Sequence, residues 1–533
     1  MPDKSVPEEN PQDQPPALRA TGKRTARNLL LTAGSYLWSA ILLVISVPIL
    51  VGGLGPARYG VFVLATLVLG YAALLDFGLT PAVVRAIAMH QAASDRAALS
   101  AIVGTALTLF MVLGIVVGAM LFIFTPLLVR HLLHLPPGLE GDATFVLELT
   151  SVGFACNLAL TLFLAVPQGV QRLDVFATRT IFLATLSAAA QIAAVKLGLG
   201  LRGVVVATLA VNLLALPIFV VLALRLMPNV SFRPRLQGWA LRQLAGFGSM
   251  KFISQVAWLA TFQLDRVIVA ALLPIAQVAY YAVPVSITQK FTLVQASFAT
   301  AVFPAASELH AVGATDRLQR LYLSAQKLML VLTLGLVIPV ALLAHPLMST
   351  WIGPAFGDAS AAILAVLAVG YGLTLLTGVP ALIADATGRP HWTAASAFAS
   401  AVINVTLTLI LVPRLGAIGA AYALAINASL QGIAFILIVQ RTLLRLPLRR
   451  FLGDVVVRPT IAGVGLAIYT LLVRGWITNF ALLVAAGAIG LAVYLALTLA
   501  VGVLSDEEKK LTLGMLRSGR SSLGALLTPK ASS

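Results

Sequence analysis

Three charged side chains lie in apolar stretches of the sequence that are typical of membrane-buried segments. Asp265 and Arg266 are adjacent in TFQLDRVIVAALLP, residues 261–274, and Lys290 lies in the next apolar stretch. A charge deep in a bilayer is costly, so it should face a cavity or a partner group rather than lipid. Arginine and lysine donors suit a phosphate or pyrophosphate. The two cations therefore predict an anion-binding cavity, with a structural ion-pair network as the alternative.

Polar residues extend the helical faces on which these charges are expected to lie. At spacings of three and four residues, Asp265 continues a stripe formed by Gln255, Trp258, Thr261 and Phe262, and Lys290 follows Ser286. Adjacent residues on a helix point about 100° apart, so Asp265 and Arg266 do not simply neutralise each other. We expect both stretches to be helices with one wet face.

The composition indicates whether these helices fold in water or in a membrane. Of the 533 residues, 59% are hydrophobic and 10% are charged, whereas charged residues make up about a quarter of a soluble domain. Crossing a bilayer takes about 20 apolar residues in helical form, because backbone groups must be paired within lipid. The sequence predicts an all-α polytopic membrane protein with about fourteen spans, near residues 29–53, 60–80, 99–125, 144–166, 176–197, 202–226, 247–273, 279–304, 323–347, 359–384, 392–413, 417–440, 455–474 and 477–503.

The formal net charge of +17 is distributed unevenly. With the amino terminus inside, 28 Lys and Arg residues fall in cytoplasmic segments or near the cytoplasmic ends of spans, 6 fall in or beside external loops, and 2, Arg266 and Lys290, lie deep within spans. This positive-inside bias predicts that both termini are cytoplasmic. Nucleic-acid binding is disfavoured, because no soluble domain carries a basic helix with interleaved aromatics. We expect the basic loops to contact anionic membrane lipids instead.

Internal repetition predicts the domain organisation. LGLGLRGVVVATLAVN, residues 197–212, is similar to VPRLGAIGAAYALAIN, residues 412–427. Six spans are an even number, so two such lobes would be parallel repeats, which commonly enclose a substrate site and alternate its access. The predicted parts are a disordered cytoplasmic tail (1–24), a six-helix lobe (25–227), a cytoplasmic linker (228–246), a second six-helix lobe (247–442), two further helices (443–504) and a cytoplasmic tail (505–533).

Several motifs, in order along the chain, resemble the polysaccharide flippases of the O-antigen type. They are LGPARYGVFVLA (54–65), LDFGLTPAVVRAIA (75–88), QLDRVIVAALLPIAQVAYYAVP (263–284), VFPAASELHA (302–311), ATGRP (386–390) and LVPRLGAIGAAYALAIN (411–427). That family belongs to the superfamily that also holds multidrug and toxic compound extrusion transporters and the lipid II flippase. The resemblance covers about residues 25–505.

The resemblance implies a V-shaped, two-lobed flippase of the bacterial inner membrane, and not an enzyme. Such a protein moves an undecaprenyl-pyrophosphate-linked oligosaccharide from the inner to the outer leaflet by alternating access through a cationic central cavity. Polysaccharide polymerase or export machinery would be its further partners. The family's cationic cavity residues would correspond to Arg266 and Lys290. Arg27 and Arg85 are candidates for first contact with the pyrophosphate, or else ordinary positive-inside anchors.

Ion coupling would require a carboxylate within the membrane. Asp265 is the first candidate, and Asp76 and Asp385, at the predicted cytoplasmic ends of their spans, are weaker ones. Each would otherwise cap a helix or pair with a neighbouring arginine. No nucleotide-binding loop ending in GK[ST] is present, so direct use of ATP is not expected.

No cofactor or metal site is predicted. GLGLRG, residues 198–203, has the glycine spacing of a dinucleotide-binding loop, but it lies between two membrane spans without a preceding strand. His131 and His134 lack a nearby cysteine or carboxylate at metal-ligand spacing.

Two other functions compete with the flippase. An ion-coupled multidrug or small-molecule antiporter would need more cavity carboxylates and fewer cations. A membrane polymerase or ligase would need a larger external platform than residues 126–143.

Overall fold

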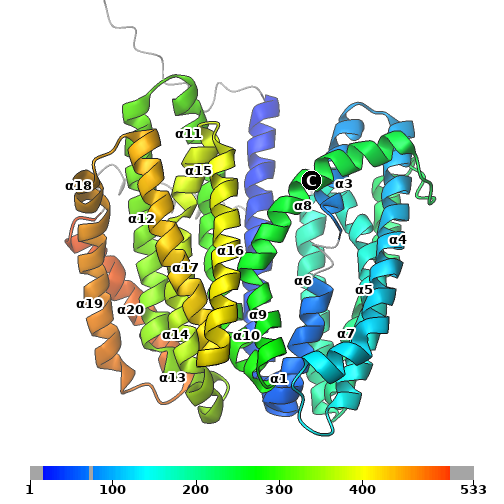
Figure 1. Cartoon of the computed structure of the whole chain (residues 1–533). Helices are drawn as coiled ribbons and strands as arrows, with labels where there is room; N and C mark the ends of the chain where they lie inside the picture. The colour runs from blue at the N-terminus through cyan, green and yellow to red at the C-terminus, as the bar shows by residue number, and fades with distance from the viewer. Residues whose placement is uncertain (1–15, 71–75, 504–533) are drawn as a thin grey trace, which may run out of the picture. The chain divides into compact units, whose positions relative to one another are not determined.

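The computed structural model describes residues 16–70 and 76–503, and these are almost entirely helical (Figure 1). The chain divides into two compact units, Met1–Ala279 and Tyr280–Ser533. The elements of the first unit are α1 (Pro16–Gly70), α3 (Leu79–Ala92), α4 (Arg96–Leu127), η1 (Leu128–Leu132), α5 (Glu140–Gly169), α6 (Leu173–Lys196), α7 (Gly200–Leu226), α8 (Gly238–Phe262) and α9 (Leu264–Leu272). α10 (Ala276–Thr288) contains the boundary between the units.

The second unit continues with helices of mixed length. Its elements are η2 (Gln289–Phe291), α11 (Thr292–Ala311), α12 (Thr315–Leu342), α13 (Ala344–Trp351), α14 (Pro354–Leu376), α15 (Gly378–Ala386), α16 (Pro390–Leu415), α17 (Ala417–Ile438), η3 (Val439–Leu444), α18 (Leu448–Phe451), η4 (Leu452–Val457), α19 (Arg458–Arg474) and α20 (Phe480–Ala500). The two predicted six-helix lobes stay a prediction, since the unit boundary leaves α8 and α9 with the first unit.

Eleven helices in the described part of the chain are long and apolar enough to cross a membrane, which makes this a multi-pass membrane protein. The fourteen expected spans differ from these at three places. The first two expected spans fall mainly in α1, which consists of two helices joined at a kink at Gly55, where φ is +76°. Residues 71–75 of the second expected span lie outside the described part of the chain. The expected spans 247–273 and 279–304 are each interrupted, the first at Gln263 and the second at η2. These interruptions occur in the two stretches that carry the charged residues.

The amino-terminal segment also differs from expectation. α1 begins at Pro16, so residues 16–24, which the sequence assigns to a disordered tail, are helical. Proline is favoured in the first helical turn, and the following Ala, Leu, Arg and Lys residues have high helix propensity. The remainder of that predicted tail, and residues 504–533, lie outside the described part of the chain.

The core of the first unit forms where α3, α4, α5, α7 and α8 meet. α4 and α5 pack closely because two glycines spaced by four residues face the backbone of α5. A Cβ on Gly114 would lie 2.9 Å from the carbonyl oxygen of Ala155, and one on Gly118 would lie 2.9 Å from that of Ser151. Small residues at this spacing let membrane helices approach each other.

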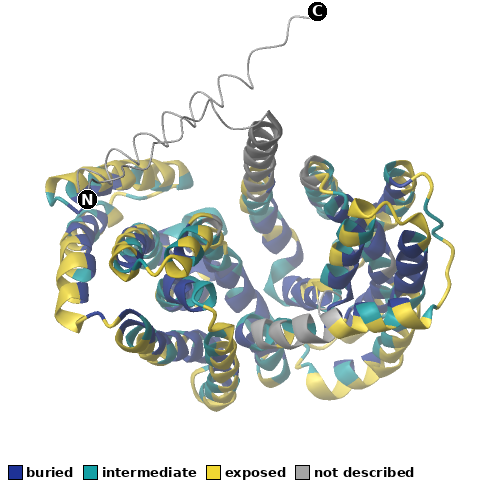
Figure 2. Cartoon of the chain, turned by 90° about the horizontal axis from the view of Figure 1, so that it is seen from above, coloured by how far each residue is buried: buried dark blue, intermediate teal, exposed yellow. Residues whose placement is uncertain are grey.

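The second unit is built around α12, α14 and α17. Buried polar side chains link its helices: Gln326 donates to the carbonyl oxygen of Leu376 (2.9 Å), and Asn427 donates to the hydroxyl of Ser400 (2.8 Å). Within each unit, Figure 2 shows the buried residues on helix faces that meet other helices and the exposed residues on outward faces. In a membrane, these outward apolar faces are expected to contact lipid.

Candidate functional site

The charged pair of the first unit lies where a helix is interrupted. α8 ends at Phe262, and Gln263 leaves the helical conformation with φ −132° and ψ −31° before α9 begins at Leu264. Asp265 therefore occupies the first turn of α9, and only 4% of it is exposed. Its Oδ1 accepts a hydrogen bond from the backbone N–H of Arg266 at 2.8 Å. A carboxylate is stabilised at this end of a helix by the unsatisfied N–H groups.

Arg266 is half-buried and is tied to the residue at the break. Its Nη1 donates to Oε1 of Gln263 at 3.2 Å. α9 also contacts α1, in which Tyr59 is buried. The guanidinium is thus held at the start of α9, close to α1.

The position of α9 is fixed by backbone packing on either side of it. A Cβ on Gly60 of α1 would lie 2.3 Å from the carbonyl oxygen of Ile275, so the two segments touch where Gly60 has no side chain. The N–H of Ile275 also donates to the carbonyl oxygen of His134 at 3.2 Å. Arg266 therefore stands on a segment held between α1 and the turn before α5.

The polar stripe expected in this region is not one continuous helical face. Thr261 is 8% exposed and is packed inside the first unit, as is Asp265. The break at Gln263 changes the helical register, so positions before and after it no longer follow one spacing of three and four. The sequence lacked a signal for this break, because neither glycine nor proline occurs at residues 260–266.

Lys290 also lies at an interruption, in the 3-10 turn η2 between α10 and α11. The turn is anchored by Phe291, which is 6% exposed, and by Thr292, whose hydroxyl donates to the carbonyl oxygen of Gln289 at 2.7 Å. Lys290 itself is exposed. Within the described ranges its side chain has no hydrogen bond or ion pair. Its ammonium is therefore available to an anion.

The other two candidate cations are less informative. Arg27 lies in α1, and its side chain is outside the described residues. Arg85 lies in α3 with an exposed side chain, between the buried residues Val83 and Ile87. Both remain candidates for first contact with an anionic substrate.

The weaker carboxylate candidates have clear local partners. Asp76 is buried and accepts hydrogen bonds from the N–H of Gly78 (2.8 Å), the N–H of Thr80 (3.3 Å) and the Thr80 hydroxyl. It thus caps the start of α3. Asp385, near the end of α15, accepts from the hydroxyl of Thr393 at 2.7 Å. Asp76 thus has the capping contacts that were the alternative for it, Asp385 has a threonine partner instead of an arginine, and ion coupling through either residue stays a prediction.

One half-buried cation was not singled out from the sequence. Arg179, in the first turns of α6, stacks over the ring of Phe219 on α7, with 5.1 Å between the guanidinium carbon and the ring centroid. The sequence feature that could have identified it is a single arginine six residues after α6 begins, followed by an apolar run.

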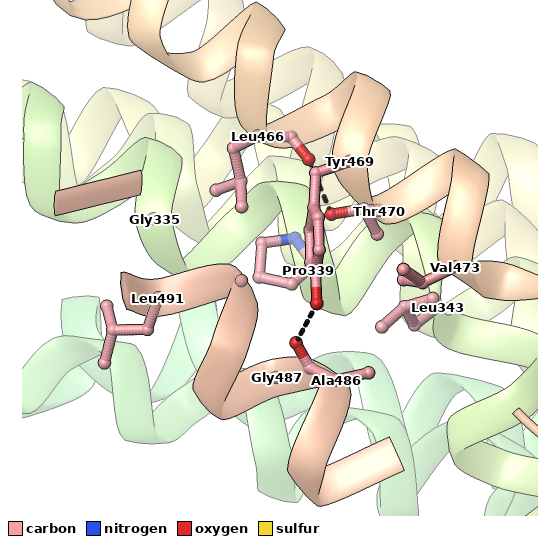
Figure 3. A pocket seen from close by; sticks show the side chains of 11 residues that line it. Gly335, Pro339, Leu343, Leu466, Tyr469, Thr470, Val473, Ala486, Gly487 and Leu491 are labelled. Carbon is pink, nitrogen blue, oxygen red and sulfur yellow. Dashed lines mark hydrogen bonds between the residues drawn. The ribbon is translucent and has the colours of Figure 1, made fainter. Parts of the chain in front are cut away.

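A small enclosed pocket lies among α12, α19 and α20 (Figure 3). Tyr469 points across it, and its hydroxyl donates to the carbonyl oxygen of Ala486 at 3.0 Å. The volume of about 30 Å³ holds about two water molecules at about 10–15 Å³ each. The last two helices are thus packed onto α12, where Tyr494 also donates to the carbonyl oxygen of Val331 at 2.9 Å. This pocket is too small for an oligosaccharide.

Metal chemistry finds no support in the described ranges, where no three His, Cys, Asp or Glu side chains gather. The glycine-rich loop at 198–203 forms the turn between α6 and α7, and Gly198 and Gly200 have φ of +71° and +61°. Glycine is favoured there because positive φ is strained for other residues.

Comparisons with known proteins agree with this architecture. A family model described as polysaccharide biosynthesis protein matches residues 25–310, just over half of the chain. The chain is 24% identical over 413 residues to a putative O-antigen transporter of Shigella flexneri, covering 76% of this chain and 96% of that protein.

Two solved structures share the fold. The lipid II flippase MurJ in an inward closed conformation matches with a TM-score of 0.65 and 13% identity, over 87% of this chain and 98% of that one. A multidrug resistance MATE family transporter of the MOP superfamily, in an inward-facing conformation, matches with a TM-score of 0.62 and 19% identity, over 75% and 93%. At these identities the likeness establishes the fold alone, an all-α MATE-like membrane fold.

Proposed function

Because the chain belongs to the polysaccharide biosynthesis protein family, we propose that it is a flippase for a lipid-linked oligosaccharide. Its substrate would be an undecaprenyl-pyrophosphate-linked repeat unit, moved from the inner to the outer leaflet of the bacterial inner membrane for surface polysaccharide biosynthesis. Both termini would be cytoplasmic, as the distribution of Lys and Arg predicts. The name of the Shigella flexneri relative, an O-antigen transporter, supports this substrate class.

The observation that carries the proposal is that Arg266 and Lys290 both lie where a helix is interrupted. Membrane transporters commonly build substrate sites at discontinuous helices, because freed backbone groups and charged side chains are tolerated where they line a cavity. Arg266 offers a planar donor fork, and Lys290 offers a compact charge on a flexible stem. Together they suit the oxygens of a pyrophosphate.

In the proposed mechanism, the two cations bind the pyrophosphate while the lipid tail stays in the bilayer. Alternating access then exposes the sugar to the outer side. Asp265 is the proposed coupling carboxylate, because it is buried beside Arg266 and its protonation would change the charge next to the bound anion. Asp76 and Asp385 keep structural roles in this scheme.

The test is the lipid content of cells that lack the protein, with a non-permeant label to assign the leaflet. The flippase predicts that complete repeat units accumulate in the inner leaflet, and that the wild-type chain restores export. Arg266→Ala and Lys290→Ala should fail to restore export while still inserting at wild-type levels. Lys196→Ala, which changes an exposed lysine at the end of α6, is the matched control and should restore it.

Two other results would refute the proposal. Normal export without an accumulated intermediate in a strain with no second flippase would favour an antiporter. Complete units stranded in the outer leaflet would instead favour a polymerase or ligase.

A further inference from the structure

An apolar groove lies between α16 and α17 of the second unit, and none of the candidate site residues lines it. It has a volume of about 400 Å³, which is in the range of about 300–1,000 Å³ typical of small-ligand sites. Trp392, Ala395 and Ala399 of α16 form one wall, and Phe435 and Ile438 of α17 form the other. This α16–α17 groove is large enough for an extended chain but not for a folded domain.

The groove exists because small residues stand where the two helices would otherwise fill the space. Ala395 and Ala399 are one turn apart on α16, and Ala434 faces the same space from α17. Its two polar side chains satisfy each other, because Gln431 donates to the carbonyl oxygen (3.1 Å) and the hydroxyl of Ser396. The remaining lining is apolar, so an apolar occupant is favoured over a polar one.

The helix surface around the groove is suited to lipid. Phe398 is 66% exposed, Leu430 is 61% exposed and Ile433 is 58% exposed. Both helices are among the eleven that can cross the membrane. In a bilayer, exposed apolar side chains of this kind are suited to contact acyl chains, which favours a lipid chain as the occupant of the groove.

A cation stands at one end of the groove. The guanidinium carbon of Arg389 lies 5.0 Å from the centroid of the Trp392 ring, which lines the groove. Arg389 is exposed, and across the described ranges it has no hydrogen-bond acceptor or carboxylate partner for its side chain. Stacking on an aromatic face leaves the five N–H donors of an arginine free to bind a phosphate.

The backbone fixes Arg389 in this place. Its N–H donates to the carbonyl oxygen of Ala384 at 2.9 Å, and Gly388 before it has a φ of +77°. The hydroxyl of Thr393, the residue after Trp392, donates a hydrogen bond to the carboxylate of Asp385. The arginine and the tryptophan are therefore positioned together by the turn between α15 and α16.

We propose that the α16–α17 groove binds an anionic membrane phospholipid, with one acyl chain in the groove and the phosphate on Arg389. The charge at the end of the groove favours an anionic headgroup. A Trp at the junction of apolar and charged surface is typical of the membrane interface. The site is independent of the proposed transport function, since none of its residues takes part in that scheme.

The experiment is native mass spectrometry of the purified full-length protein with added phosphatidylglycerol or phosphatidylcholine. The wild-type chain should retain one phosphatidylglycerol more tightly than phosphatidylcholine. Arg389→Ala should weaken phosphatidylglycerol binding by about five-fold and remove the preference. Ala395→Trp, which fills the groove, should abolish retention of both lipids.

Matched controls separate the groove from general effects. Arg414→Ala changes the exposed arginine at the opposite end of α16, and Ala397→Trp adds bulk to an exposed position of α16 outside the groove. Both should bind phosphatidylglycerol as the wild type does.

Unchanged phosphatidylglycerol retention in both Arg389→Ala and Ala395→Trp would overturn the proposal. A dimer that Ala395→Trp dissolves, with no lipid retained by the wild type, would overturn it too, by making the groove a contact between two copies of the chain.

Discussion

Arg266 and Lys290 both lie at helix interruptions, but their surroundings differ. Arg266 is half-buried, hydrogen-bonded to Gln263 and carried by a segment packed against Gly60. Lys290 is exposed and has no partner in the described ranges. The first unit thus offers a hydrogen-bonded, directional donor, and the second offers an exposed charge. For the proposed pyrophosphate site, we therefore expect shape recognition to depend on Arg266 and electrostatic capture on Lys290.

Reversing the charge at Lys290 should have the largest effect on export. Lys290→Glu places like charge against a bound pyrophosphate, which costs several kcal/mol, so export should fall at least about 100-fold. The fold should be unaffected, because Lys290 is exposed and its turn is anchored by Phe291. Export is measured as surface polysaccharide per inserted protein. Lys196→Glu is the control, and an equal loss in both variants would make the effect one of general surface charge.

The packing that holds the segment of Arg266 can be disrupted at Gly60. Gly60→Ala would place a Cβ 2.3 Å from a backbone oxygen, so it should destabilise the protein by about 1–3 kcal/mol. Gly52→Ala, on the same helix with nothing within 4 Å of the new Cβ, should be neutral or slightly stabilising. Thermal unfolding in detergent measures both. Equal unfolding temperatures for the two variants would show that α9 is not held by this contact.

Conservative exchanges sharpen the contrast between shape and charge. Arg266→Lys keeps the charge but loses the planar fork, so export should fall about ten-fold. Lys290→Arg keeps an exposed cation, so export should stay within about two-fold of the wild-type level. Transport rates at matched expression decide the matter. If the two exchanges had the same effect, the division of roles between the two cations would be wrong.

The smallest effect is expected at a carboxylate assigned to structure. Asp76→Asn replaces one of the two accepting carboxylate oxygens at the start of α3 by an NH2 group and should cost about 1 kcal/mol of stability. The ion dependence of transport should not change, whereas Asp265→Asn should remove it. Transport measured with and without an imposed ion gradient distinguishes the two. A loss of ion dependence in Asp76→Asn alone would move the coupling role to that residue.

The spans were predictable where the sequence is uniformly apolar. α4, α14 and α20 follow from long runs of Leu, Val and Ala, because hydrocarbon accepts little else. The bend at Gly55 also had a signal, in the Gly-Pro pair at 55 and 56.

The sequence did not predict the interruptions at Gln263 and Lys290. Neither site carries glycine, and the proline nearest to Lys290, Pro284, lies within α10, four residues before that helix ends. Contacts between residues far apart in the sequence, such as Gly60 with Ile275, position the segment that follows the first break, and no local pattern predicts such contacts. The cap formed by Asp76 had a local signal in its spacing to Thr80.

Restoring the charge at position 290 chemically tests the central claim most directly. The variant Lys290→Cys is made in a chain whose single native cysteine is removed by Cys156→Ala. Export is then measured after modification with a positively charged aminoethyl thiosulfonate or with a neutral methyl thiosulfonate. The account predicts that the cysteine variant is inactive, that the cationic reagent restores export and that the neutral one does not. Equal export after both reagents would contradict a role for positive charge at this position.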